Sequence, residues 1–440
     1  MTDIAMTQTD TQKQRAANAA EAVRRSLKRR YAAEARFKAY GIGAIAIAML
    51  TIVVLFGTII KGGLPAFTET VIEMELTLDE SVIDPQGTRD PGTLARANYR
   101  RIVFDALTAK FPDVTNRREK RELTAMMSRG ASFQVQQLVT NDPSLIGQTI
   151  TMTAPVSSDF DLYNKGVINR DVDEADRRVS DQQMVWFDRL KEQGVVSTQF
   201  NFGFFSSADS REPELAGIWG AAAGSFYTML VTLLLSFPIG VAAAIYLEEF
   251  APKNRLTQII EVNINNLAAV PSIVFGLLGL AVFINFFGLP RSAPLVGGMV
   301  LALMTLPTII IASRAALKAV PPSIREAAMG LGASRMQVVG HHVLPLAMPG
   351  ILTGTIIGMA QALGETAPLL MIGMVAFIVD VPGGVTDPAT VLPVQIYLWA
   401  DSPERAFVAR TSAAIMVLLG FLVFMNALAV VLRKKFERRW

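Results

Sequence analysis

Few residues of this 440-residue chain carry side chains that do covalent or metal chemistry. There is no cysteine, so neither a disulfide nor a thiolate metal site can form. The two histidines, His341 and His342, are too few for a histidine-based metal centre. No Gly-Lys dipeptide occurs, which excludes the Gly-x4-Gly-Lys-Ser/Thr loop that binds nucleotide phosphates. The sequence therefore predicts no cofactor and no nucleotide hydrolysis by that route.

The residues best suited to a mechanical role lie in a polar stretch at 314–345. Ser323 and Glu326 have the spacing of a capping box, in which each side chain accepts a hydrogen bond from a backbone amide at a helix start. Ser334 and Gln337 repeat that spacing. Prolines precede the first box and glycines separate the two, at Pro321, Pro322, Gly330 and Gly332. We expect two short helices joined by a tight turn.

Small side chains follow the first predicted capping box. Ala327 and Ala328 would leave a smooth surface on the first helix, where another protein can pack closely. Capping boxes also occur in ordinary loops, so by themselves they indicate local structure and not a partner.

Apolar spans must position this loop. Hydrophobic residues make up 51% of the chain and charged residues 18%, which is too apolar for a soluble enzyme. Residues 41–60 contain no charge, and a helix of that length crosses a hydrocarbon core of roughly 30 Å. The sequence predicts six spans, at 41–60, 217–246, 262–287, 294–313, 346–377 and 412–432.

Charges on the connections predict the orientation of these spans. The leader 1–40 has nine Lys/Arg against four acids, and the tail 433–440 is also basic. Loop 314–345 has four basic residues against one acid, whereas the connection 378–411 has four acids against two Arg. By the positive-inside rule, the loop and both termini are cytoplasmic in a multi-pass protein of the cell inner membrane.

Two segments lie outside the span region. Residues 1–40 predict a basic helix that binds anionic lipid rather than nucleic acid, through Arg24, Arg25, Lys28, Arg29 and Arg30. Residues 61–216 have a net charge of −6, from eighteen Lys/Arg and twenty-four acids, and are long enough for a domain facing the periplasm.

The pattern within 61–216 predicts an α+β domain. Residues 71–78 and 148–152 alternate as strands do, and 93–140 predicts two or three amphipathic helices. One apolar helix face consists of Tyr99, Ile102, Val103, Ala106 and Leu107. We interpret this domain as a docking or stabilising cap.

The residue order in the loop resembles the coupling loop of ABC-importer permeases, Glu-Ala-Ala-x3-Gly-x9-Ile-x-Leu-Pro. The matching positions are Glu326, Ala327, Ala328, Gly332, Leu344 and Pro345, while His342 stands where an aliphatic residue is expected. The resemblance implies that this loop, with Arg325, couples transport to a separate ATPase. It also implies an all-α polytopic membrane protein with six transmembrane helices of type I ABC-importer permease type, and the α+β insert between helices 1 and 2.

Three further stretches, at 240–252, 270–276 and 362–370, resemble the PstA family of phosphate-importer permeases. The resemblance covers residues 217–432. It implies a PstC-like second permease, a homodimeric ATP-binding subunit that holds ATP and magnesium, and a periplasmic phosphate-binding protein. The chain itself would be a channel subunit for inorganic phosphate and not an enzyme.

Two interruptions of the spans suggest a translocation path. Glu365 falls in the fifth span, where an ionisable group is expensive and marks a functional hypothesis. A carboxylate repels phosphate, so we expect it to pair with a cation, either structurally or in a gate. The resemblance to the PstA family implies an Arg one helical turn before Glu365, where this chain has Gln361. Pro271 and Ser272 interrupt the third span. The candidate path residues are Pro271, Ser272, Gln361, Gly364, Glu365 and Thr366.

Other functions stay open at this point. The runner-up is a permease for another oxyanion, such as sulfate or molybdate. A proton-coupled secondary transporter would need more acids inside the spans than Glu365 and Glu261. A membrane enzyme would need catalytic residues in 61–216, which contains neither histidine nor cysteine.

Overall fold

The computed structural model describes residues 2–436 and divides into two compact units, Met1–Lys61 and Gly62–Trp440. Nearly all of the first unit belongs to one helix, α1 (Thr2–Gly63). The basic leader and the first span therefore form one continuous helix. The helical stretch Arg29–Phe67, which runs from α1 through the following 3-10 turn, is long and apolar enough to cross a membrane.

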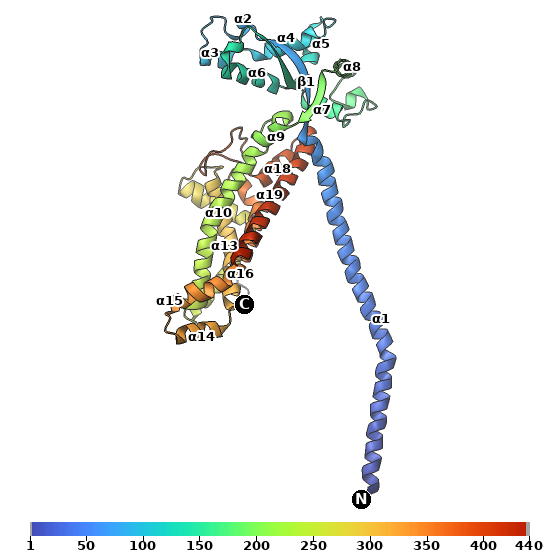
Figure 1. The fold of residues 1–440 in the computed structure, drawn as a ribbon, viewed down its shortest axis with the longest axis vertical. Coiled ribbons are helices and arrows are strands. Elements are labelled where there is room, and N and C mark those ends of the chain that lie inside the picture. The colour runs from blue at the N-terminus through green and yellow to red at the C-terminus, as the bar shows by residue number, and fades with distance from the viewer. Residues whose placement is uncertain (1, 437–440) are drawn as a thin grey trace. The chain divides into compact units, whose positions relative to one another are not determined.

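A three-stranded antiparallel sheet lies in the insert, in the order β2-β1-β3 (Figure 1). The central strand β1 (Thr68–Thr77) pairs along most of its length with β2 (Thr149–Pro155), and its first half pairs with β3 (Val196–Phe200). The strands predicted at 71–78 and 148–152 are confirmed. The sequence does not predict β3, because its side chains are mostly polar or exposed and show no apolar alternation.

Helices cover one face of this sheet and enclose the core of the insert. α4 (Tyr99–Ala109) contacts β1, and α6 (Gly130–Asn141) contacts β2. Of the predicted apolar face of α4, Tyr99, Ile102, Val103 and Leu107 are buried. The segment 93–140 holds four helices, not two or three, because α3 (Pro91–Arg96) and α5 (Arg117–Thr124) form as short separate helices. The remaining helical elements of the insert are η1 (Leu64–Phe67), α2 (Glu80–Ile83), η2 (Pro143–Leu145), α7 (Ser158–Asn164), η3 (Glu174–Asp176), α8 (Asp181–Glu192), α9 (Phe202–Ser206) and η4 (Pro213–Leu215).

Charged side chains gather where the insert joins the apolar helices. The Lys165 ammonium donates to the carbonyls of Pro65 (2.8 Å) and Thr68 (2.7 Å) and to the Asp161 carboxylate (2.5 Å). Burial lowers the pKa of Lys165 and raises the pKa of Glu214. Arg410, buried near the start of the last helix, donates to the Ala216 carbonyl. The Lys165 contacts join parts of the insert to one another, and the Arg410 contact joins the insert to the last helix.

Long apolar helices form the rest of the second unit. α10 (Trp219–Ile245), α13 (Pro294–Lys318) and α16 (Leu344–Gly364) pack together, and α19 (Ala406–Phe436) packs on α16 and on α18 (Leu392–Ala400). Small residues bring the backbones close: a Cβ on Gly354 would lie 2.1 Å from the Ala312 Cβ. Within residues 2–436, five helices are long and apolar enough to cross a membrane, and a bent pair brings the number up to six. The predicted six-span fold is confirmed.

Two predicted spans are broken. The third consists of α11 (Arg255–Ala268), then α12 (Ser272–Leu278) with the π-helical η6 (Gly279–Phe286), and the two parts meet at 103°. The break falls at Pro271, which has no N–H to continue a helix. The fifth span ends at Gly364, before the short α17 (Ala367–Met371). Glu365 is therefore the residue that ends α16, at the interruption of the fifth span.

Candidate functional site

The predicted loop folds as two short helices after α13. α14 (Pro322–Gly330) begins with Pro321 as its N-cap, so Ser323 already lies inside the first turn. The Ser323 hydroxyl makes no capping hydrogen bond, and the predicted capping box of Ser323 and Glu326 is wrong. The physical reason is the proline pair: Pro322 is favoured at the first helical position and starts the helix earlier.

The second capping box is present. The backbone N–H of Gln337 donates to the Ser334 hydroxyl (3.4 Å), and the backbone N–H of Ser334 donates to the side-chain oxygen of Gln337 (2.9 Å). It starts α15 (Arg335–Val338), which continues through the π-helical η7 (Val339–Val343) into α16. Gly332, between α14 and α15, has φ +88°, a conformation that favours glycine. Contacts between residues close in sequence therefore fix the second helix, α15, and the turn before it.

Arg325 fixes the other side through contacts far away in the sequence. Its guanidinium donates to the Glu249 carboxylate at 2.7 Å, and also to the carbonyls of Val320 (2.7 Å) and Leu317 (2.9 Å). Glu249 lies in the π-helical turn η5 (Tyr246–Phe250) that ends α10. The Arg325 side chain is 20% exposed and that of Glu249 11%. Arg325 therefore anchors α14 to the ends of α10 and α13.

A second ion pair stands beside the first. Arg314 of α13 pairs with Glu261 of α11 at 2.7 Å and lies 3.6 Å from Glu248. The neighbouring acids of η5 thus contact two different helices: Glu248 lies beside Arg314 of α13, and Glu249 pairs with Arg325 of α14. The sequence offers one signal for this, an acidic pair at the end of an apolar span, but no pattern that names the arginine partners.

The two faces of α14 differ. Ala328 is buried against the apolar cluster that includes Val320, Val338 and Ala347. The interpretation of Ala328 as part of a docking surface is therefore wrong, because this methyl group packs inside. Glu326 and Ala327 are exposed. Large apolar side chains near them also face outward: Met329, Leu331 and Met336 are 46%, 91% and 71% exposed.

The end of the loop explains the irregular His342. Within η7, Val339 and Val343 are buried, whereas His342 is exposed. Leu344 and Pro345 begin α16, and Leu344 packs against the same apolar cluster as Ala328. A polar side chain at position 342 therefore leaves the packing of this helix intact.

The candidate path residues lie at two breaks whose helices meet. Pro271 and Ser272 begin α12, which packs on α17 so closely that a Cβ on Gly276 would lie 2.7 Å from the Pro368 Cα. Gly364, Glu365 and Thr366 form the break just before α17.

The Glu365 carboxylate has no hydrogen-bond or ion-pair partner among residues 2–436. Gln361, one turn earlier, is exposed and does not bond to it. The two predicted interruptions are thus brought together, but no cation from residues 2–436 pairs with Glu365 there.

Comparisons with known proteins agree with this geometry. Residues 236–439 match the family model described as the binding-protein-dependent transport system inner membrane component. Residues 24–174 match a domain of unknown function, DUF3333. YqgI of Bacillus subtilis (strain 168), a probable ABC transporter permease protein, is 34% identical over 174 residues, which cover 39% of this chain and 58% of YqgI.

Relatives named PstA match over a larger share of their length. The phosphate transport system permease protein PstA 1 of Mycobacterium tuberculosis (strain ATCC 25618 / H37Rv) is 31% identical over 223 residues, covering 51% of this chain and 71% of that protein. PstA of Haemophilus influenzae (strain ATCC 51907 / DSM 11121 / KW20 / Rd) is 33% identical over 199 residues, covering 45% and 69%. The chain belongs to the PstA permease family. As a PstA permease it is a multi-pass protein of the inner membrane.

Proposed function

We propose that this chain is the permease subunit of an ATP-driven importer that carries inorganic phosphate across the inner membrane. The observation that carries the proposal is the α14–α15 loop. Arg325 and Ala328 hold the loop against the helical core, while Glu326, Met329 and Leu331 face away from it. A rigidly seated helix with an exposed apolar and acidic face suits a surface that receives force from another protein.

The partners and orientation follow from this proposal. The loop and both termini face the cytoplasm, and the insert faces the periplasm. A homodimeric ATP-binding subunit docks on the loop and holds ATP with magnesium. A PstC-like permease completes the pathway, and a periplasmic phosphate-binding protein delivers the substrate. Phosphate as the cargo is supported by membership of the PstA family.

The broken helices support a path through the membrane. Pro271 and Ser272 on one side, and Gly364, Glu365 and Thr366 on the other, interrupt helices that pack together. Backbone groups freed by such breaks can line a polar path. We place Gln361 at its edge. A cation from the second permease would satisfy Glu365.

Uptake of radiolabelled phosphate by the assembled complex in proteoliposomes tests the proposal. We expect uptake that requires ATP inside the vesicles and is not displaced by excess sulfate or molybdate. Displacement by either oxyanion would assign that ion as the cargo. Uptake that persists without ATP and collapses with the proton gradient would show a secondary transporter.

A further inference from the structure

The central strand of the insert has an unpaired edge. The ladder between β1 and β3 ends where the Glu73 amide donates to the Val195 carbonyl (2.8 Å). In an antiparallel strand, the backbone groups of alternate residues point to opposite neighbours. Those of Leu78 point towards β2, because the Leu78 amide donates to Gln148. The N–H and C=O of Glu75 therefore point to the side that β3 has left.

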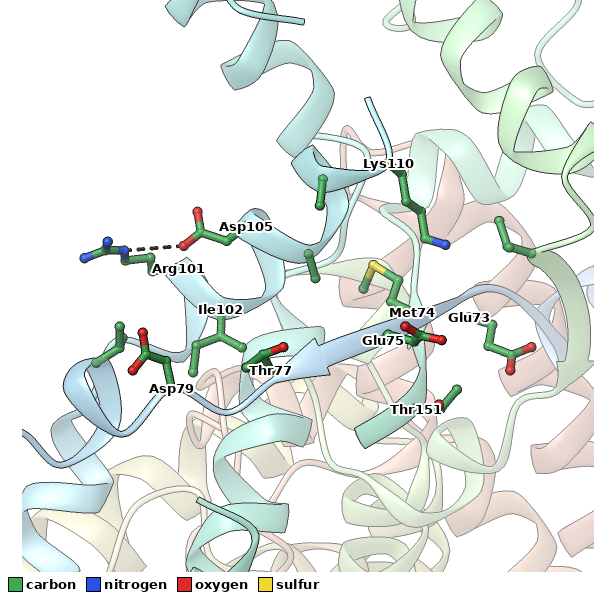
Figure 2. A pocket seen from close by; sticks show the side chains of 14 residues that line it. Glu73, Met74, Glu75, Thr77, Asp79, Arg101, Ile102, Asp105, Lys110 and Thr151 are labelled. Atoms are coloured by element: carbon green, nitrogen blue, oxygen red, sulfur yellow. Dashed lines mark ion pairs between the residues drawn. The ribbon is translucent and has the colours of Figure 1, made fainter. Parts of the chain in front are cut away.

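A groove runs along this edge (Figure 2). It has a volume of about 600 Å³ and lies between β1 and α4. Ile102, Ala106 and Ala109 of α4 line one wall, and Glu73, Glu75 and Thr77 line the other. Val195, the residue just before β3 begins, closes the groove at one end. A strand laid in the groove would continue the line of β3.

The charges of the groove specify what such a strand carries. Arg101 pairs with Asp105 at 3.4 Å, whereas Glu73 and Glu75 have no ion-pair partner within residues 2–436. Lys110 is the remaining cation among the lining residues, and Asp79 is a further acid. The groove thus keeps an excess of negative charge beside the outward N–H and C=O of Glu75 and the N–H of Thr77, whose carbonyl accepts from the Asp79 amide (2.9 Å).

We propose that this edge binds an extended segment of a partner protein, which adds a strand beside β1 and bears Lys or Arg at alternate positions. Main-chain hydrogen bonds to the N–H and C=O of Glu75 and to the N–H of Thr77 give the affinity of such β-augmentation, and alternate side chains give its specificity. The basic side chains face Glu73 and Glu75, and the small apolar ones between them face Ile102 and Ala106. A second copy of this chain fits poorly, because antiparallel pairing of two such edges sets glutamates against glutamates.

A synthetic peptide tests this on the full-length chain in detergent micelles. The probe is a fluorescein-labelled peptide of alternating lysine and valine, read by fluorescence anisotropy. A matched peptide carries the same charges but is N-methylated at the backbone amides of its lysines, so it cannot donate hydrogen bonds to β1 with its lysines on the face of Glu73 and Glu75. We expect the first peptide to bind at least about tenfold more tightly than the second. Equal binding would overturn the proposal, because charge alone would then explain it.

Variants of the chain locate the binding. Glu73→Lys combined with Glu75→Lys should weaken binding of the lysine–valine peptide about tenfold, since two attractive contacts become repulsive. The matched control is Asp171→Lys, a reversal of an exposed charge outside the groove, which should leave binding unchanged. Equal loss in both variants would contradict a site at the edge. Light scattering that shows a dimer abolished by Glu75→Pro would instead assign the edge to a second copy.

Discussion

Two arginines hold loops at the two ends of α10 by different means. Arg325 donates to the Glu249 carboxylate just beyond the end of α10, and to two carbonyls at the end of α13. Arg410 donates to the Ala216 carbonyl just before α10 begins and lies over the Phe204 ring, 5.8 Å from its centroid. No carboxylate within residues 2–436 is hydrogen-bonded to Arg410. Loss of Arg325 would therefore leave a carboxylate without its ion-pair partner. Loss of Arg410 would leave only a carbonyl without its hydrogen-bond donor.

The largest effect is expected from Arg325→Met. The substitution leaves the Glu249 carboxylate largely buried without its partner, which should cost about 2–3 kcal/mol of unfolding free energy. ATP-driven uptake should fall strongly, because α14 loses its seat. Denaturant unfolding of the purified chain measures the first effect, and proteoliposome uptake the second.

Arg325→Lys is the matched control for this prediction. Lysine keeps the charge but not the planar fork that serves Glu249 and two carbonyls together, so it should recover only part of the stability. Full recovery would show that the charge alone seats the loop.

Arg410→Met is expected to cost less, about 1 kcal/mol or below. Removing a buried guanidinium also removes the cost of desolvating it, and the main loss is the hydrogen bond to the Ala216 carbonyl. The same unfolding assay measures it. A loss as large as that of Arg325→Met would mean that the acids around Arg410 depend on its charge.

A smaller effect concerns pH and Glu214, beside Arg410. Burial raises the pKa of this carboxyl above its ordinary value of 4.5, so the folded chain binds the proton more tightly than the unfolded chain. Stability should therefore fall as pH rises from 4.5 through the raised value. Glu214→Gln should remove the part of this slope that Glu214 contributes in an unfolding series across that range. The pKa of Asp84 is lowered from 3.8 by the Arg89 amide, and its opposite slope lies below that value and should persist in the variant.

The smallest effect on stability is expected from Glu365→Gln. The carboxylate has no partner within residues 2–436, so unfolding free energy should change by less than about 0.5 kcal/mol. Uptake should nevertheless fall several-fold while the complex still assembles, since the group lies at the paired helix breaks. Wild-type transport by this variant would remove Glu365 from the mechanism.

Local patterns carried much of the fold. Hydropathy located the spans, because a membrane demands about twenty apolar residues in a row. The break at Pro271 and the capping box from Ser334 to Gln337 depend on neighbours a few residues away, and both are present. The first predicted capping box is wrong for an equally local reason: the helix begins at Pro322, so Ser323 is not its N-cap.

What sequence could not supply is long-range pairing. Arg325 and Glu249 are 76 positions apart, and no periodicity links them. Burial of Ala328 likewise depends on Val320 and Val338 closing over it from other elements. β3 forms by pairing with the edge of β1. Its own residues show no alternation of apolar side chains from which a strand could be predicted.

Cysteine cross-linking tests the central claim most directly, since the chain has no native cysteine. Leu331→Cys places a thiol on the outward face of the loop, at a side chain that is 91% exposed, and Asp171→Cys places one on the insert. In an assembled complex active in transport, Leu331→Cys should cross-link to the ATP-binding subunit and Asp171→Cys should not. An active complex in which the loop thiol never reaches that subunit would contradict coupling through α14 and α15.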